Sequence, residues 1–267
     1  MGRLRLVTAP GFEDVLADAG LDDPAALARF VDSLTPDRSR SAGRAATALL
    51  GTRGGEIFVK RALKGGALGP AFLGRIPRFA RVAGELDGTA QLLGRGAPVL
   101  APAFAAGVRD VLGWKAVLGT LHRPGALDGA RALAACGDDA STAARLGHAM
   151  GCAIRLFHDV GGSHADLAVT NLLHDPGDGS LRVIDLQGAH VGAAPDENRR
   201  RRELARLRRS IERRPELQAA APAAWAALLA GYIEGDGEGE AGFGPGFASS
   251  LSAAATVLAA SPHRSST

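Results

Sequence analysis

Residues 161–175 read GGSHADLAVTNLLHD, and a second apolar run, LRVI, follows shortly after them. Asp166 and Asn171 lie five positions apart, and Asp185 lies 19 positions beyond Asp166, directly after LRVI. The turn residues DPGDGS between the two apolar runs predict a β-hairpin. Such a hairpin carries Asn171 and Asp185 on opposing strand ends, close to the loop that holds Asp166. Three oxygen-bearing side chains in one place suit Mg²⁺, which prefers hard oxygen ligands.

The composition is that of an ordinary soluble globular protein. The 267 residues are 46% hydrophobic and 22% charged, enough for one large domain or two lobes. A net charge of +3 does not by itself indicate a nucleic-acid-binding protein. Cys136 and Cys152 are too few for a disulfide framework, and no Cys/His cluster has zinc spacing. Without a signal peptide or a run of roughly 20 apolar residues, we expect a cytoplasmic, reduced protein.

The N-terminal part of the chain combines strands with one longer helix. Residues 12–33 predict two short helices, and residues 39–63 predict two strands joined by the turn TRGG. Apolar residues at helical spacing predict a helix over residues 78–93. Extended segments are expected at residues 102–108 and 111–119. This order of hairpin, helix and strands predicts an antiparallel sheet with a helix.

The C-terminal part is richer in helices. Residues 141–160 predict a strong helix, with Leu146, Met150 and Phe157 on one face. The hairpin segment follows, and then a basic segment and further Ala-rich helix. We therefore expect an α+β protein with two lobes. Residues 1–119 would form an N-terminal lobe of antiparallel sheet plus helix, and residues 120–267 a mainly helical C-terminal lobe.

The segments HADLAVTN and IDLQG resemble the catalytic loop and the metal-binding aspartate of the protein-kinase-like fold. That fold also places a lysine on a strand, an acidic residue on the next helix and a flexible phosphate-covering turn before the lysine. Lys60 in EIFVKR, Glu85 on the predicted helix and Gly43 in SRSAGRAA occupy these places in the right order. The five elements together indicate the fold far more strongly than any one of them.

A narrower resemblance is to the lipopolysaccharide kinase family, which includes the Kdo kinases and the core heptose kinases. It covers roughly residues 40–214 and rests on the segments FVKRALKGGALGPAFLG, GELDGTAQLLGRGAPVLAP, GGSHADLAVTNLL, VIDLQGAHVG and RRRRELARLRRSI. The resemblance implies ATP and Mg²⁺ as cofactors. It also implies phosphoryl transfer to a sugar hydroxyl of a lipopolysaccharide-core or related glycolipid.

The resemblance assigns roles to three residues of the C-terminal lobe. Asp166 would accept or orient the proton of the acceptor hydroxyl, largely by positioning it. Asn171 and Asp185 would hold Mg²⁺. Taken alone, Asp166 could be a turn-capping aspartate and Asn171 an ordinary loop residue. Asp185 is harder to explain without a partner, because a carboxylate at the end of an apolar strand must find a cation, donors or water.

The residues assigned to the N-terminal lobe depend more heavily on the rest of the pattern. Lys60 would neutralise the α- and β-phosphates of the nucleotide, with Glu85 as its ion-pair partner. Taken alone, Lys60 is typical of an edge-strand surface and Glu85 of a solvated helix face. Gly43 is a single glycine and no phosphate motif in itself. We expect His164 to support its loop by hydrogen bonding, not to transfer a proton.

Residues 199–214 hold nine arginines against Glu203 and Glu212, so nine minus two gives +7 over 16 residues. Such a run is usually a solvated face or a nucleic-acid patch. No aromatic residues interleave with the arginines, which weakens stacking on single strands, and under the kinase hypothesis we expect no nucleic-acid partner. On a helix, the run could contact an anionic inner-membrane surface or an anionic acceptor. Leu204, Leu207 and Ile211 have helical spacing, so one face can pack on the lobe.

Several features depart from regulated protein kinases. Ala165 stands between His164 and Asp166, DLQG replaces the D-F-G motif, and no A-P-E-like element follows. These departures favour an unregulated small-molecule or glycolipid kinase. Three other hypotheses stay open: a kinase of a soluble small molecule, resembling the aminoglycoside phosphotransferases; a catalytically inert kinase-like binding protein; and a nucleic-acid-binding protein that uses the arginine run.

Overall fold

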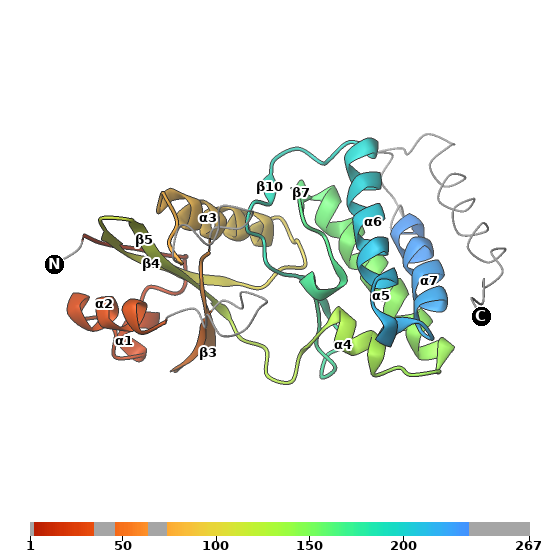
Figure 1. Cartoon of the computed structure of the whole chain (residues 1–267), viewed down its shortest axis with the longest axis horizontal. Helices are drawn as coiled ribbons and strands as arrows, with labels where there is room; N and C mark the ends of the chain where they lie inside the picture. The colour runs from red at the N-terminus through yellow and green to blue at the C-terminus, as the bar shows by residue number, and fades with distance from the viewer. Residues whose placement is uncertain (1–2, 35–45, 64–73, 235–267) are drawn as a thin grey trace, which may run out of the picture. The chain divides into compact units, whose positions relative to one another are not determined.

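The structure, a computed structural model, describes residues 3–34, 46–63 and 74–234 (Figure 1). The chain divides into two compact units. Unit 1 comprises residues 1–94 and 99–124, and unit 2 comprises residues 95–98 and 125–267. The lobe boundary expected between residues 119 and 120 falls inside the strand β5 (Gly113–Leu121) of unit 1. Unit 1 contains an antiparallel sheet and unit 2 is mainly helical, so the predicted α+β class is confirmed.

Unit 1 is built on a five-stranded antiparallel sheet with the order β1-β4-β5-β3-β2. Besides β5, its strands are β1 (Leu4–Thr8), β2 (Thr47–Thr52), β3 (Gly55–Arg61) and β4 (Pro102–Asp110). The predicted hairpin is confirmed, because β2 pairs with β3 through Thr52 opposite Gly55. Gly55 has a φ of 120°, which an L side chain rarely adopts. The strand β1, which pairs with β4, was not predicted from the sequence.

Helices cover both faces of this sheet (Figure 1). The helices α1 (Val15–Asp18) and α2 (Pro24–Ser33) pack on one face, against Ile57 and Val59 of β3. The helix α3 (Ala80–Gly94) packs on the other face through buried Val82 and Leu86. Side chains alternate between the faces along a strand, so Lys60 lies on the α3 side.

Arg61 closes the end of α2. Its side chain is buried, and Nη1 donates hydrogen bonds to the carbonyl oxygens of Val31 (2.7 Å) and Leu34 (3.1 Å). These carbonyls belong to the last turn of the helix and to its C-cap, which have no partner within the helix. Burial lowers the pKa of Arg61 to about 10, so the guanidinium stays charged at neutral pH.

The helices of unit 2 are α4 (Gly129–Ala134), α5 (Ala140–Asp159), α6 (Glu197–Glu212) and α7 (Ala221–Glu234). The strands β6 (Leu127–Asp128), β8 (Leu172–His174) and β9 (Leu181–Val183) form one small sheet, and β7 (Gly162–Ser163) pairs with β10 (His190–Val191). The predicted hairpin around DPGDGS is confirmed as β8–β9. Within the described ranges, every helix is too short or too polar to cross a membrane.

The helices α5 and α7 approach each other closely at two glycines of α5. A Cβ at Gly147 would lie 2.1 Å from the carbonyl oxygen of Ala224, and one at Gly151 would lie 2.0 Å from that of Leu228. Both distances are shorter than any real contact of a Cβ atom, so only glycine permits this packing. The approach places Tyr232 of α7 within reach of the polar residues on α5.

Aspartates define where four of the helices begin. Each accepts a hydrogen bond from a backbone N–H of the first turn, as N-cap residues do: Asp23 before α2, Asp128 before α4, Asp139 before α5 and Asp196 before α6. The cap of α6 is short, with 2.7 Å between Asp196 Oδ1 and the Arg199 nitrogen. The start of the basic helix is thereby fixed relative to the chain before it.

Candidate active site

The 164–171 loop connects β7 to β8 and ends in a short 3-10 helix, η2 (Val169–Asn171). Leu167 and Val169 of this loop are completely buried. The Asp166 side chain, in contrast, is 76% exposed. The buried residues therefore fix the loop in the core of unit 2 and leave the Asp166 carboxylate accessible to a substrate.

His164 is a buried support of this loop. The backbone N–H of Asp166 donates to His164 Nδ1 (3.1 Å), and His164 Nε2 lies 3.1 Å from the carbonyl oxygen of Ile184. An N–H can only donate and a carbonyl can only accept, so the imidazole is neutral and carries its proton on Nε2. The expectation that His164 supports the loop by hydrogen bonding is confirmed. Both ring nitrogens are occupied by the backbone.

Asn171 ties the loop to itself and to the strand β9. Its Nδ2 donates to the carbonyl oxygen of Asp166 (2.9 Å), and its own carbonyl oxygen accepts from the backbone N–H of Ile184 (2.9 Å). The peptide groups of Ile184 are thus held by His164 on one side and by Asn171 on the other. Asp185 is the next residue, so its position is fixed relative to the loop. The structure thus joins Asp166 to Asn171 by a hydrogen bond and ties Asn171 to Ile184, the residue before Asp185.

Asp185 adopts an uncommon backbone conformation. Its φ of 57° lies in the left-handed region, and no other non-glycine residue within the described ranges has a positive φ. Such a conformation costs roughly 1–3 kcal/mol for an L-residue and is often found at functional sites. The residue is exposed, so the carboxylate is open to solvent.

The helix α6 contacts the 164–171 loop through one of its faces. Glu203 Oε2 accepts from the backbone N–H of His164 (2.8 Å), and Ser210 Oγ accepts from that of Val169 (2.8 Å). Between them, Arg206 Nη1 lies 3.3 Å from Asp166 Oδ1. Residues 203, 206 and 210 are three and four positions apart, so they share one face of the helix. The basic helix therefore positions the loop that carries Asp166.

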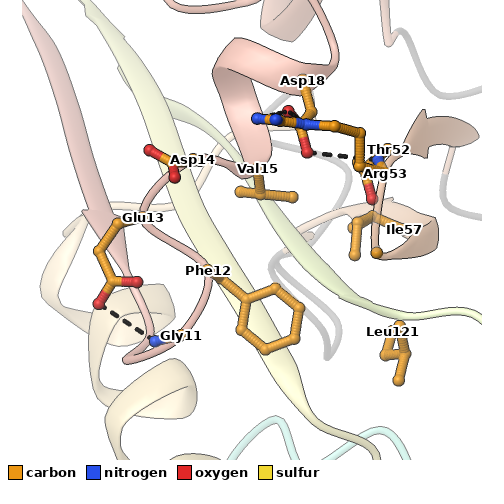
Figure 2. A pocket seen from close by; sticks show the side chains of 11 residues that line it. Gly11, Phe12, Glu13, Asp14, Val15, Asp18, Thr52, Arg53, Ile57 and Leu121 are labelled. Carbon is orange, nitrogen blue, oxygen red and sulfur yellow. Dashed lines mark hydrogen bonds and ion pairs between the residues drawn. The ribbon is translucent and has the colours of Figure 1, made fainter.

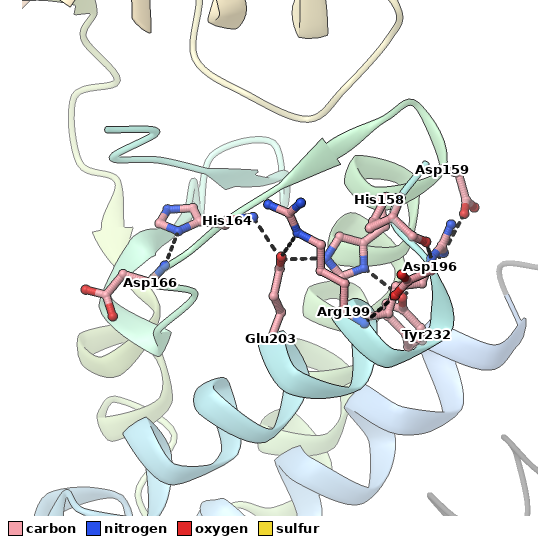
Figure 3. A network of polar contacts seen from close by, with 10 residues as sticks. His158, Asp159, His164, Asp166, Asp196, Arg199, Glu203 and Tyr232 are labelled. Carbon is pink, nitrogen blue, oxygen red and sulfur yellow. Dashed lines mark hydrogen bonds and ion pairs between the residues drawn. The ribbon is translucent and has the colours of Figure 1, made fainter. Parts of the chain in front are cut away.

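Glu203 belongs to a buried polar network that links α5, α6 and α7 (Figure 3). His158 Nε2 lies 3.1 Å from Glu203 Oε2, and His158 Nδ1 lies 2.7 Å from the hydroxyl of Tyr232. Burial lowers the pKa of His158 below its ordinary 6.5 and raises the pKa of Tyr232 to about 12. The neutral phenol therefore donates to Nδ1, and Nε2–H donates to the Glu203 carboxylate.

The outer end of this network is formed by two arginines around Asp159. Arg155 Nε and Arg200 Nη1 lie 2.6 and 2.7 Å from the two carboxylate oxygens of Asp159. Both arginine side chains are less than a tenth exposed, at 5% and 8%. The pair of contacts joins α5 to α6 and leaves Arg200 unavailable for any ligand.

The structural roles of Arg200 and Glu203 were not predicted from the sequence, where Glu203 counts only as a negative charge within the arginine run. A signal was present, because both residues have the same helical spacing as Leu204, Leu207 and Ile211, which are buried as predicted. A charged residue on the buried stripe of a helix must find a partner.

The predicted nucleotide-binding residues belong to unit 1. Lys60 lies on β3, which is an interior strand between β5 and β2, so the alternative of an edge-strand surface residue is wrong. Lys60 and Glu85 are both half-buried, and α3, which carries Glu85, covers the face on which Lys60 lies. Their ion pair stays a prediction. Gly43 lies outside the described residues.

A pocket in unit 1 lies beside α1 and the β2–β3 turn (Figure 2). Glu13, Asp14 and Asp18 supply its carboxylates, and Arg53 Nε donates to Asp18 Oδ1 (2.6 Å) at its rim. None of the predicted site residues lines this pocket. We therefore assign it no part in the candidate site.

The residues predicted to hold Mg²⁺ have the right chemistry for it. Asn171 Nδ2 is used by the loop, and its Oδ1 has no hydrogen-bond partner in the described part of the chain. Asp185 adds an exposed carboxylate. These two hard oxygen donors suit Mg²⁺, which binds through few protein groups and keeps several waters. Across the described ranges, no group of three or more His, Cys, Asp or Glu is placed to hold a metal ion.

Comparison with known proteins supports this interpretation of the fold. Residues 75–232 match the family model described as the lipopolysaccharide kinase (Kdo/WaaP) family. The chain is similar to a solved structure described as WaaP in complex with acyl carrier protein, with a TM-score of 0.56 and 18% identity over 95% of this chain and 99% of that one. At this identity the likeness shows the fold, and the predicted kinase-like fold is confirmed. A search of curated proteins found no match.

Proposed function

Because the chain belongs to the lipopolysaccharide kinase (Kdo/WaaP) family, we propose that it transfers a phosphoryl group from ATP to a sugar hydroxyl of a lipopolysaccharide-core or related glycolipid. The acceptor sugar would be Kdo or heptose. One observation carries the proposal: the exposed Asp166 carboxylate lies on a loop whose backbone is anchored by His164, Asn171 and Glu203. Phosphoryl transfer needs such positioning more than covalent help from the protein.

Asp166 would orient the acceptor hydroxyl and accept its proton. Oδ1 lies beside Arg206, and Oδ2 makes no contact with another described residue, so one oxygen is available to the hydroxyl. The buried neighbours of Asp166 hold the backbone of its loop in place, which reduces the entropy that is lost when the acceptor binds. This role rests on the family and on the geometry of the loop together.

Asn171 and Asp185 would hold Mg²⁺, and Lys60 with Glu85 would bind the phosphates of the nucleotide. When bound, Mg²⁺ supplies positive charge to the phosphate oxygens. The chain itself contributes the fixed position of Asp185, because the preceding residue is hydrogen-bonded on both sides. A glycolipid acceptor would place the enzyme in the cytoplasm, at the inner face of the inner membrane.

The proposal is tested by phosphoryl transfer from labelled ATP, with Mg²⁺, to extracted lipid A–core glycolipid. Asp166→Asn keeps the shape of the side chain and should lower kcat by about 10²–10⁴-fold. Asp138→Asn is the matched control, because Asp138 is also exposed and its side chain contacts no other described residue. The control should retain the wild-type rate.

The outcomes separate the open hypotheses. Transfer to the glycolipid that Asp166→Asn abolishes supports the proposal. Transfer to soluble sugars or amino alcohols without transfer to the glycolipid would indicate a small-molecule kinase. A protein that binds no nucleotide and transfers nothing would be an inert member of the family. An Asp166→Asn variant within tenfold of the wild-type rate would contradict the role of this carboxylate.

A further inference from the structure

The nine arginines of residues 199–214 differ in their partners and in their exposure. Six are paired with carboxylates of unit 2: Arg199 with Glu203, Arg200 with Asp159, Arg201 with Glu197, Arg206 with Asp166, Arg208 with Glu212 and Arg214 with Glu216. Four of the nine are exposed, and we refer to these as the arginine stripe: Arg202, Arg206, Arg209 and Arg213. Arg206 lies beside Asp166, while the other three side chains have no partner among the described residues.

The arginine stripe occupies one face of α6. Its members are spaced four, three and four positions apart, which brings them into line along the helix. At a rise of 1.5 Å per residue, the stripe is about 16 Å long. Arg206 belongs both to the stripe and to the face that contacts the 164–171 loop. The line of guanidinium groups therefore runs past the Asp166 carboxylate.

Apart from Arg206, which is paired with Asp166, the stripe carries positive charge that no described residue neutralises. Like charges three and four positions apart on a helix destabilise it. The carboxylates of α6 pair elsewhere: Glu197 with Arg201, Glu203 with His158 and Arg199, and Glu212 with Arg208. Exposed guanidinium groups bind carboxylates and phosphates through two parallel hydrogen bonds. A ligand with several such groups would fit the stripe.

We infer that the arginine stripe binds the anionic groups of the acceptor saccharide. This inference rests on the proposed function and adds to it the kind of acceptor: an extended saccharide with carboxylates or phosphates on several sugars. A compact monosaccharide would reach only part of a stripe of about 16 Å. Arg206 binds the anion nearest to the hydroxyl that Asp166 orients. The stripe thus aligns the saccharide along α6.

Two other ligands are less well matched. A membrane surface is usually bound by basic residues together with apolar residues that insert into it. The exposed large hydrophobic side chains of the described residues all lie outside α6: Leu6, Leu49, Leu93, Val111, Leu112 and Leu156. Single-stranded nucleic acid is bound by stacking on aromatic side chains, and residues 197–214 contain none.

The test compares two double variants that remove the same charge from α6. Arg202→Gln/Arg209→Gln removes two of the four stripe arginines. Arg201→Gln/Arg208→Gln removes two paired arginines that lie outside the stripe. The probe is lipid A–core saccharide made soluble by alkaline deacylation, which keeps its carboxylates and phosphates. Binding is measured by calorimetry without nucleotide. We expect the Kd of the stripe variant to rise about tenfold or more, and that of the control less than about threefold.

A second arm measures the binding of the wild type and both double variants to vesicles of phosphatidylglycerol and phosphatidylcholine. Equal loss of saccharide binding in both double variants would overturn the inference, because net charge alone would then explain it. Loss of vesicle binding with unchanged saccharide binding would also overturn it, in favour of a membrane site.

Failure of the proposed function has a different signature. In that case the wild type transfers no phosphate to the glycolipid, yet the saccharide still binds in a stripe-dependent way. Failure of the inference alone gives wild-type transfer and wild-type KM in the stripe variant.

Discussion

Removal of the Glu203 carboxylate should both destabilise unit 2 and release the 164–171 loop. The carboxylate is 5% exposed and accepts from two buried donors, the His164 backbone N–H and His158 Nε2–H. Glu203→Ala leaves both donors without an acceptor. A buried unsatisfied donor costs about 1–3 kcal/mol, so the free energy of unfolding should fall by about 2–6 kcal/mol.

The conservative variant separates charge from shape. Glu203→Gln keeps one oxygen that can accept from both donors, but it loses the negative charge. Charge-assisted hydrogen bonds are about twice as strong as neutral ones, so a loss of about 1–2 kcal/mol is expected. Glu212→Gln is the matched control on the same helix. Its ion pair with Arg208 is largely at the surface and should contribute less than about 1 kcal/mol.

Urea denaturation measures the stability of each variant, and hydrogen exchange measures the loop directly. Faster exchange at the His164 amide is expected in Glu203→Ala, together with a kcat reduced about tenfold or more through misplacement of Asp166. Suppose that Glu203→Ala destabilised the protein no more than Glu212→Gln and left the His164 amide protected. The buried network would then not be what holds the loop, and the reasoning would be refuted.

Three further perturbations test the packing and the electrostatics. Gly151→Ala should lower the free energy of unfolding by about 3 kcal/mol, because its Cβ would overlap the backbone of α7. Gly84→Ala on α3 has open space around its Cβ and should raise the free energy of unfolding by up to about 1 kcal/mol. Thermal denaturation measures both variants. Arg61→Met should cost about 2–4 kcal/mol in urea denaturation, because the last carbonyls of α2 lose their donor, while Arg29→Met at the surface should change little. Because the pKa of His158 is lowered in the folded protein, the unfolded chain binds more protons than the folded one below about pH 6.5. The free energy of unfolding should therefore fall by up to about 1.4 kcal/mol per pH unit as the pH drops below this value. His158→Gln should abolish this dependence.

The local patterns of the sequence determined the hairpin of unit 2 and one long helix in each unit. The hairpin β8–β9 closes through a short turn, so the positions of Asn171 and Asp185 follow from turn residues and strand spacing alone. The amphipathic helices α3 and α5 could likewise be predicted from the period of their apolar residues. In each case the residues that decide the structure lie within a few turns of one another along the chain. The candidate loop itself was recognised by the resemblance of HADLAVTN and IDLQG to the kinase motifs.

Contacts between distant segments were not predictable in this way. The strand β1 is defined by its pairing with β4, about a hundred residues later, and its own sequence is a weak signal. The sequence gives no sign that Gly147 and Gly151 must be glycine, because this need arises only from the packing of α7 against them. Arg61 follows Lys60 in a strand, yet its role depends on where α2 ends.

The arginine run shows most clearly what each level decides. The sequence determined that residues 199–214 are strongly basic and helical, with an apolar face. Only the tertiary structure decided that Arg200 pairs with Asp159, because Asp159 lies on α5. In contrast, Arg199, Arg201 and Arg208 pair within α6 with carboxylates four positions away, which helical spacing allows. The tertiary structure also placed Glu203 and Arg206 against the 164–171 loop. Pairs four positions apart follow from the helical period, which is a local property, whereas the partners of Arg200, Glu203 and Arg206 depend on which surfaces the folded chain brings together.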